Sequence, residues 1–139
     1  MSKNNTAADT NPTLNGSRLR SPLTNINKAC QTCHRQEEKE LLARVELIQD
    51  RTAALKQSTE KALTDAIDAI AAAEKAGASE ESLKEARHRY RRASMRWDFV
   101  SSENSMGFHS SQEAARIYAN AIDFGRQAQY EALRATPAR

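Results

Sequence analysis

The stretch that decides the fold runs from residue 36 to residue 76 and reads QEEKELLARVELIQDRTAALKQSTEKALTDAIDAIAAAEKA. It holds no glycine or proline, the residues that most disfavour a helix interior. Its apolar and small side chains recur at alternating spacings of four and three, the heptad pattern of a helix packed along a seam. The seam residues are Leu41, Val45, Ile48, Thr52, Leu55, Thr59, Ala62, Ala66, Ala69, Ala73 and Ala76. We therefore predict one long helix over residues 36–76.

The two halves of this seam carry side chains of different size. Large apolar residues dominate the first half and alanine the second, where Leu63, Ile67 and Ile70 add a second apolar row. Small side chains let another helix approach closely. We expect the alanine half to need a partner helix that buries it.

A second helix is predicted directly after the first. Gly77 is placed to end the first helix in a left-handed conformation, and Ser79 to cap the next one. The short link makes the two helices an antiparallel hairpin, with the second running to about Ser101. Its apolar face holds Leu83, Ala86, Tyr90, Ala93 or Ser94, Trp97 and Val100. Its arginines are expected to form a solvated face paired with acidic neighbours: Arg87, Arg89, Arg91, Arg92 and Arg96.

The segment ENSMGFH at residues 103–109 interrupts the helical pattern, and a third helix follows it. Ser110 and Glu113 have the spacing of a capping box. The helix is predicted to end before Pro137. Its apolar residues are Ala114, Ile117, Tyr118, Ala121, Ile122, Gly125, Ala128 and Leu133. The fold class is therefore all-α: a cysteine-containing segment, a long helical hairpin and a third C-terminal helix.

Composition limits the remaining possibilities. The chain has 139 residues with four glycines and three prolines, too little turn material for a many-stranded sheet. The net charge of +3, with both signs interspersed, gives no indication of nucleic-acid binding. No apolar run is long enough to span a membrane. Residues 1–17 are expected to be disordered, residues 18–28 to form a linker, and residues 1–20 to carry no secretory signal.

The chemistry of the chain is concentrated in Cys30-Gln31-Thr32-Cys33-His34. This C-x-x-C-H pattern is the attachment signature of c-type haem: the two thiols bind the vinyl groups, and the histidine is the proximal iron ligand. Two other uses of the cysteines are open. A thioredoxin-like dithiol would need flanking strands, which the pattern lacks. A zinc site would need further ligands, and His88 and His109 are the remaining histidines.

His109 lies in the predicted loop beside Met106 and Gly107. It is either a surface residue or an axial iron ligand, since two histidines suit an electron-transfer haem. Gly107 would allow the backbone to approach a flat ring closely. His88 is expected to be solvated, and Tyr90 and Trp97 to belong to the core. Asp98 and Glu103 are too isolated in the sequence to be assigned as general acids.

Three separated stretches together resemble the C-terminal part of the ammonia-forming cytochrome c nitrite reductase. They are RSPLTNINKACQTCHRQE at 20–37, RWDFVSSENSMGFHSSQEAARI at 96–117 and NAIDF at 120–124. The resemblance covers roughly Arg18 to Leu133. It implies a periplasmic enzyme with five haems that reduces nitrite to ammonia. It also implies a homodimer formed by the long helices, a redox partner, and a calcium ion in the full-length enzyme.

The resemblance implies a role for each candidate site residue. Cys30 and Cys33 correspond to the cysteines that hold the last haem c, the one covalent haem expected on this chain, and His34 to its proximal ligand. His109 corresponds to the distal ligand of the penultimate haem, which is attached upstream in that family.

Departures from the family pattern define what we expect of this chain. It has no C-x-x-C-K motif for the lysine-ligated catalytic haem and a single C-x-x-C-H, and Ser17 stands where the family has a histidine ligand. We therefore expect residues 18–136 to form a haem-c and dimerisation region encoded by a truncated or mis-started reading frame. Residues 1–17 are expected to be unrelated to the family. The chain alone should not reduce nitrite and would need the haem-bearing N-terminal part or a separate subunit. Two alternatives are a haem-free helical module that dimerises through the seam, and a small standalone monohaem cytochrome.

Overall fold

The structure is a computed structural model that describes residues 21–137. A short 3-10 helix, η1 (Pro22–Thr24), and α1 (Ile26–Ala29) precede three long helices: α2 (Glu38–Lys75), α3 (Glu80–Ser101) and α4 (Ser111–Ala135). No strand occurs within the described residues, which confirms the all-α prediction. The described residues divide into two compact units, 21–44 and 45–137. The predicted disordered segment 1–17 lies outside the described residues.

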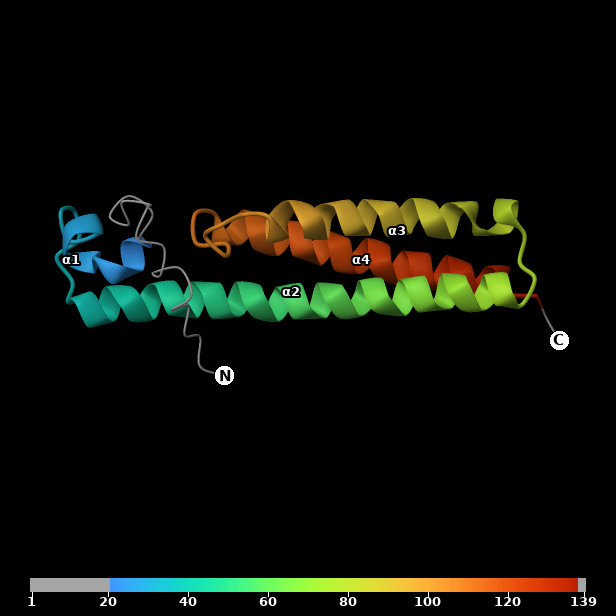
Figure 1. The fold of residues 1–139 in the computed structure, drawn as a ribbon, viewed down its shortest axis with the longest axis horizontal. Coiled ribbons are helices and arrows are strands. Elements are labelled where there is room, and N and C mark those ends of the chain that lie inside the picture. Colours follow the sequence, from blue (N-terminus) through green and yellow to red (C-terminus); the bar gives the residue numbers. More distant parts are fainter. Residues whose placement is uncertain (1–20, 138–139) are drawn as a thin grey trace, which may run out of the picture. The chain divides into compact units, whose positions relative to one another are not determined.

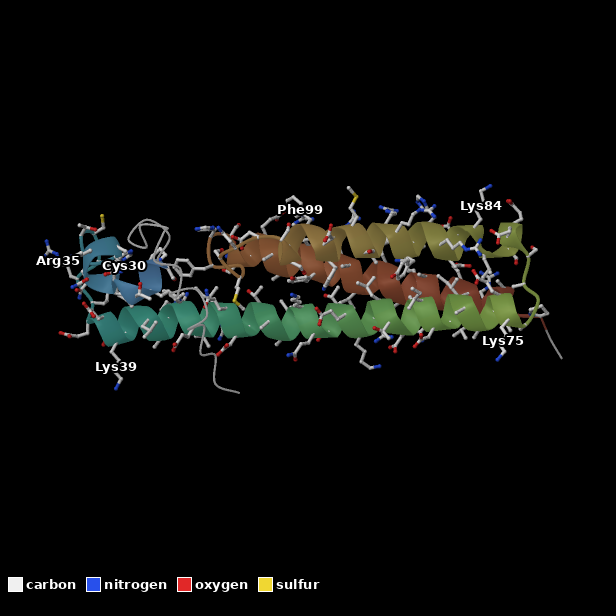
Figure 2. All side chains as sticks on the ribbon, viewed as in Figure 1. Cys30, Arg35, Lys39, Lys75, Lys84 and Phe99 are labelled. Atoms are coloured by element: carbon white, nitrogen blue, oxygen red, sulfur yellow. The ribbon has the colours of Figure 1, made fainter. Side chains whose placement is uncertain are left out.

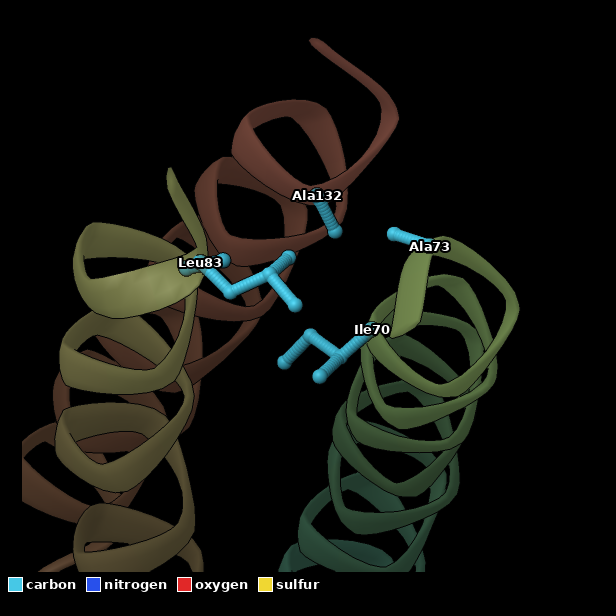
Figure 3. Close-up of a cluster of buried hydrophobic side chains, with 5 residues drawn as sticks. Ile70, Ala73, Leu83 and Ala132 are labelled. Atoms are coloured by element: carbon cyan, nitrogen blue, oxygen red, sulfur yellow. The ribbon is translucent and has the colours of Figure 1, made fainter. Parts of the chain in front are cut away.

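The second unit is a bundle of three helices. The part of α2 that follows residue 45 lies alongside α3 and α4 (Figure 1). Near the α2–α3 turn, side chains from all three helices form one apolar cluster (Figure 3). The buried members of this cluster are Ile70, Ala73, Leu83, Ala86 and Ala132. The core of the bundle is therefore built mainly from small side chains around a few large ones.

A second cluster lies toward the other end of the bundle and combines Val100, Ala114 and Tyr118. The Tyr118 side chain is 1% exposed, and its hydroxyl lies 3.2 Å from Ser101 Oγ. Trp97 packs against this cluster while its indole N–H donates to Glu60 Oε1 at 3.2 Å. Tyr90 packs against the first cluster. The prediction that Tyr90 and Trp97 belong to the core is confirmed.

The partner helix of the alanine half of α2 is α4. Ala62, Ala66 and Ala73 are fully buried. A Cβ placed on Gly125 of α4 would lie 3.2 Å from Ala62 Cβ and from Ala62 O, so these backbones approach closely. The alanine half of the seam is thus covered within the chain, as the prediction that it needs a partner helix requires. The third helix already occupies that surface.

The turn between α2 and α3 contains the predicted glycine stop and serine cap. Gly77 adopts a φ of +92°. Its N–H donates to Glu74 O at 2.9 Å, and the N–H of Ala78 donates to Ala73 O at 3.0 Å, the two bonds of a Schellman stop. Ser79 Oγ accepts the N–H of Ser82 at 3.2 Å and caps α3. These local signals were sufficient to place both helix ends.

The capping box predicted at the start of α4 is not formed. Ser110 occupies the N-cap position, but its side chain makes no capping hydrogen bond, and the Glu113 side chain pairs with Arg116. Leu133 is 60% exposed, while Ala132 is fully buried in its place. The small side chain fits the narrow space between helices, and the larger one faces out.

The arginines of α3 divide into two groups. Arg87 binds Glu74 and Glu80, and Arg89 binds Glu85, as expected of a solvated face. The guanidinium groups of Arg92 and Arg96 instead lie over the ring of Phe124, at 4.0 and 4.7 Å from its centroid. Stacking of this kind adds a cation–π attraction between α3 and α4. No helix within residues 21–137 is both long enough and apolar enough to cross a membrane.

Candidate functional site

The C-x-x-C-H segment forms a tight turn at the end of α1. The helix closes with the Cys30 N–H donating to Ile26 O at 2.8 Å. The N–H groups of Cys33 and His34 both donate to Cys30 O, at 3.1 and 2.9 Å. The side-chain amide of Gln31 donates to Gln36 O at 2.9 Å. The motif residues are therefore held by local backbone contacts and leave their reactive groups free.

The three candidate attachment residues are accessible. Cys33 and His34 are exposed, and both thiols are free. Cys30, labelled in Figure 2, is half-buried. Two free thiols followed at once by an exposed imidazole are the donor set that covalent haem attachment requires. The residues present therefore fit this group. Within residues 21–137, no three His, Cys, Asp or Glu side chains gather into a cluster suited to a metal ion.

The same unit contains a cavity of about 500 Å³ between the η1–α1 segment and the start of α2. Leu23, Ile26 and Leu42 supply its apolar lining, and Glu38 and Lys39 its charged lining. Its lining does not include the cysteines or His34. The cavity is thus a separate feature of the unit that carries the motif.

The second candidate feature is the loop between α3 and α4, which is organised by the carboxylate of Glu103. Its Oε1 accepts the Ser105 N–H at 2.7 Å and lies 3.1 Å from His109 Nδ1. Its Oε2 accepts the Ser105 hydroxyl at 2.7 Å and the Gly107 N–H at 3.0 Å. The N–H of His109 donates to Ser105 Oγ at 3.0 Å. One carboxylate therefore ties Ser105, Gly107 and His109 together, while Gln49 of α2 donates to Ser105 O at 3.1 Å.

These hydrogen bonds explain the charge state of Glu103. Partial burial acts to raise its pKa, but the bonds from Gly107, Ser105 and His109 outweigh this effect and lower the pKa to about 2. Sequence reasoning missed this role. The available signal was an acidic residue just after a helix, followed by Ser105 and Gly107, whose hydroxyl and N–H groups can fold back onto it.

Gly107 approaches α2 closely, at Thr52. It has a φ of +81° and is buried against α2. A Cβ on it would lie 2.5 Å from Thr52 Oγ1 and 2.8 Å from Thr52 Cγ2. The side chain of Thr52 therefore fills the space on the Cβ side of Gly107, and the approach of a flat ring to this backbone stays a prediction. His88 is exposed, as expected, and His109 is exposed as well.

The candidate residues fall into both compact units. Cys30, Cys33 and His34 lie in the first unit, and His109 lies in the second. Cys30, Cys33 and His34 lie close together because they are near neighbours in the sequence. The assignment of all four as haem-site residues stays a prediction.

Comparison with known proteins identifies relatives over most of the chain. A family model described as cytochrome c552 matches residues 6–138, and so begins upstream of the stretches compared above. "Cytochrome c-552" of Aliarcobacter butzleri is 36% identical over 109 residues, covering 76% of this chain and 21% of that protein. "Cytochrome c-552" of Bacteroides thetaiotaomicron is 36% identical over 111 residues, covering 79% and 22%. "Cytochrome c nitrite reductase subunit NrfA" of Nitratidesulfovibrio vulgaris is 31% identical over 115 residues, covering 78% and 22%. The chain thus spans about a fifth of the length of the curated relatives it matches.

Proposed function

The chain belongs to the cytochrome c552 family, and from that premise we propose that it is the C-terminal, haem-bearing part of an ammonia-forming cytochrome c nitrite reductase. The observation that carries the proposal is the turn after α1, where two free thiols and an exposed imidazole follow one another. The relative named as a nitrite reductase subunit supports the choice of reaction.

The residues of the turn have separate roles in this proposal. The thiols of Cys30 and Cys33 would each add across one vinyl group of haem. Sulfur bonds to one carbon and the thiol hydrogen goes to the other, so the addition is redox-neutral. The imidazole of His34 would bind the iron from the proximal side. Haem held in this way supplies one-electron transfer.

Substrate chemistry is not assigned to these residues. The lysine-ligated haem that reduces nitrite in the resembling family has no attachment motif in this sequence. We therefore propose an electron-transfer role, in which His109 ligates the iron of a neighbouring haem carried by the N-terminal part of the enzyme or by a separate subunit. Calcium is proposed for the full-length enzyme alone. The periplasm is the proposed compartment, where c-type haem would be attached.

Homodimer formation is proposed through outward surfaces of the long helices, since the buried part of the seam is covered by α4. Several large apolar side chains remain exposed on α2, α3 and α4, and Phe99 points away from the bundle (Figure 2). They are Leu47, Ile67, Met95, Phe99, Tyr130 and Leu133. Light scattering of the purified chain is expected to give the mass of a dimer, and a monomer at high concentration would contradict this part of the proposal.

The proposal is tested by exporting the full chain, with a leader added, in cells that carry the c-type maturation machinery. The pyridine haemochrome spectrum is expected to show haem held by two thioether bonds. Cys30→Ala or Cys33→Ala should give the spectrum of a single thioether, and the double variant should lose covalent haem. His34→Ala removes the proposed proximal ligand of the iron. His88→Ala is its matched control, because His88 is also an exposed histidine but lies outside the motif. A wild-type chain without covalent haem would refute the proposal, and steady nitrite reduction by the isolated chain would refute the electron-transfer assignment.

A further inference from the structure

In the loop between α3 and α4, both the backbone N–H and the imidazole ring of His109 are held by hydrogen bonds. The N–H of His109 donates to Ser105 Oγ at 3.0 Å, and Ser105 Oγ donates in turn to Glu103 Oε2 at 2.7 Å. The ring reaches the other oxygen of the same carboxylate, with Nδ1 3.1 Å from Oε1. Glu103 is thus connected to His109 by two independent routes.

The direction of the ring hydrogen bond follows from the chemistry of its partner. At neutral pH a glutamate side chain is ionised and can only accept hydrogen bonds. Both oxygens already accept a backbone N–H, from Ser105 at Oε1 and from Gly107 at Oε2. The ring nitrogen that faces Oε1 must therefore donate. In the neutral imidazole the proton is then on Nδ1, and Nε2 carries the lone pair.

We propose that Glu103 is a positioning residue that holds His109 in the Nδ1–H tautomer and so keeps Nε2 available as a metal-ligating nitrogen. The side chain of His109 is 72% exposed, and within residues 21–137 the structure gives Nε2 no hydrogen-bond partner. Histidines that ligate metals generally donate their other ring N–H to a carboxylate or carbonyl group. The tautomer follows from the hydrogen bonds, whereas the metal that Nε2 would meet, the iron of a neighbouring haem, rests on the proposed function.

The tautomer can be measured on the haem-free chain. Long-range ¹H–¹⁵N correlation of the full ¹⁵N-labelled protein, at about pH 8 so that ordinary imidazoles are neutral, reports which ring nitrogen carries the proton. For His109 we expect a pyrrole-type signal from Nδ1 and a pyridine-type signal from Nε2. His88, exposed on α3, is the internal reference and should show mainly the Nε2–H form of free imidazole. A predominantly Nε2–H ring at His109 would overturn the proposal.

Variants separate positioning from general stability. In Glu103→Gln, an NH₂ group replaces one of the two carboxylate oxygens. In one orientation of the amide it faces the Ser105 N–H, and in the other it faces the Gly107 N–H. Either way, one backbone N–H loses its acceptor. His109 is then expected to shift toward the tautomer ratio of His88. Glu113→Gln, which removes an exposed acid paired with Arg116, should leave the ratio unchanged. Glu103→Ala removes both acceptor oxygens, and an unchanged ratio in that variant would also overturn the proposal.

The wild-type measurement decides the question even if Glu103→Gln loosens the loop. Because these spectra are recorded without haem, failure of haem attachment and failure of the tautomer assignment are separate results. A chain that takes up haem but has an Nε2–H His109 would retain the proposed function and lose this inference.

Discussion

The contact between Gly107 and Thr52 gives a quantitative prediction about how the α3–α4 loop is fixed to α2. Replacement of Gly107 by alanine introduces two penalties. One is backbone strain, because φ is +81°, and the other is steric, because the new Cβ would lie 2.5 Å from Thr52 Oγ1. Gly77 separates the two penalties: its φ is +92°, but nothing lies within 4 Å of a Cβ placed on it.

The size of each penalty can be worked out from these two positions. A left-handed conformation costs a non-glycine residue about 1–2 kcal/mol, so Gly77→Ala should lower the free energy of unfolding by about that amount. Overpacking of a well-filled site costs a further ~1–3 kcal/mol. Gly107→Ala should therefore cost about 2–5 kcal/mol. Thr52 is 8% exposed and has little room to move away.

Urea unfolding followed by helical circular dichroism measures both variants against the wild type. A double-mutant cycle with Thr52→Ala isolates the steric part, because alanine at position 52 removes both of the closest atoms. We expect the second substitution to restore most of the difference between Gly107→Ala and Gly77→Ala. Equal losses for the two glycine variants, or no coupling with Thr52→Ala, would refute the packing argument.

Three further predictions concern single side chains. Ser79→Ala should destabilise the protein by about 1 kcal/mol, because it removes a cap hydrogen bond, whereas Ser110→Ala should cost clearly less in the same urea titration. Leu83→Ala should cost about 2–5 kcal/mol and Leu133→Ala almost nothing, since Leu83 is fully buried and Leu133 is 60% exposed; similar losses would contradict the assigned helix faces. The pKa of Glu103 is lowered from 4.5 to about 2, so its contribution to stability is present above pH 4.5 and is lost as the pH falls toward 2. When the free energy of unfolding is measured across this pH range, Glu103→Gln should show a smaller change than the wild type. An equal change in both proteins would show that the hydrogen-bond network around Glu103 is not formed.

The sequence was most informative where structure depends on neighbouring residues. Gly77 and Ser79 marked the end of one helix and the start of the next, because a left-handed stop and a side-chain cap each involve a few consecutive residues. The heptad spacing identified the packed face of α2 for the same reason. It could not identify the helix that covers this face, since α4 is distant in sequence and contributes small residues such as Gly125.

Residue size explains which side chains of α4 are buried. Leu133 is strongly apolar but 60% exposed, because the helices pack too closely there for a large side chain, and Ala132 is buried instead. In the loop, the role of Glu103 depends on Met106 and Gly107, both of which have positive φ. A backbone path of that kind cannot be inferred from residue types alone. The C-x-x-C-H motif could be identified because its chemistry is contiguous.

The most direct test of the proposed function is a mass measurement on the attachment segment. Trypsin cleavage after Lys28 and Arg35 releases residues 29–35, which contain both cysteines and His34. After export and maturation, we predict that this peptide carries the mass of one haem and has no free thiol. A peptide with unmodified cysteines, or with only a disulfide between them, would contradict the assignment of this chain as a haem-bearing part of the enzyme.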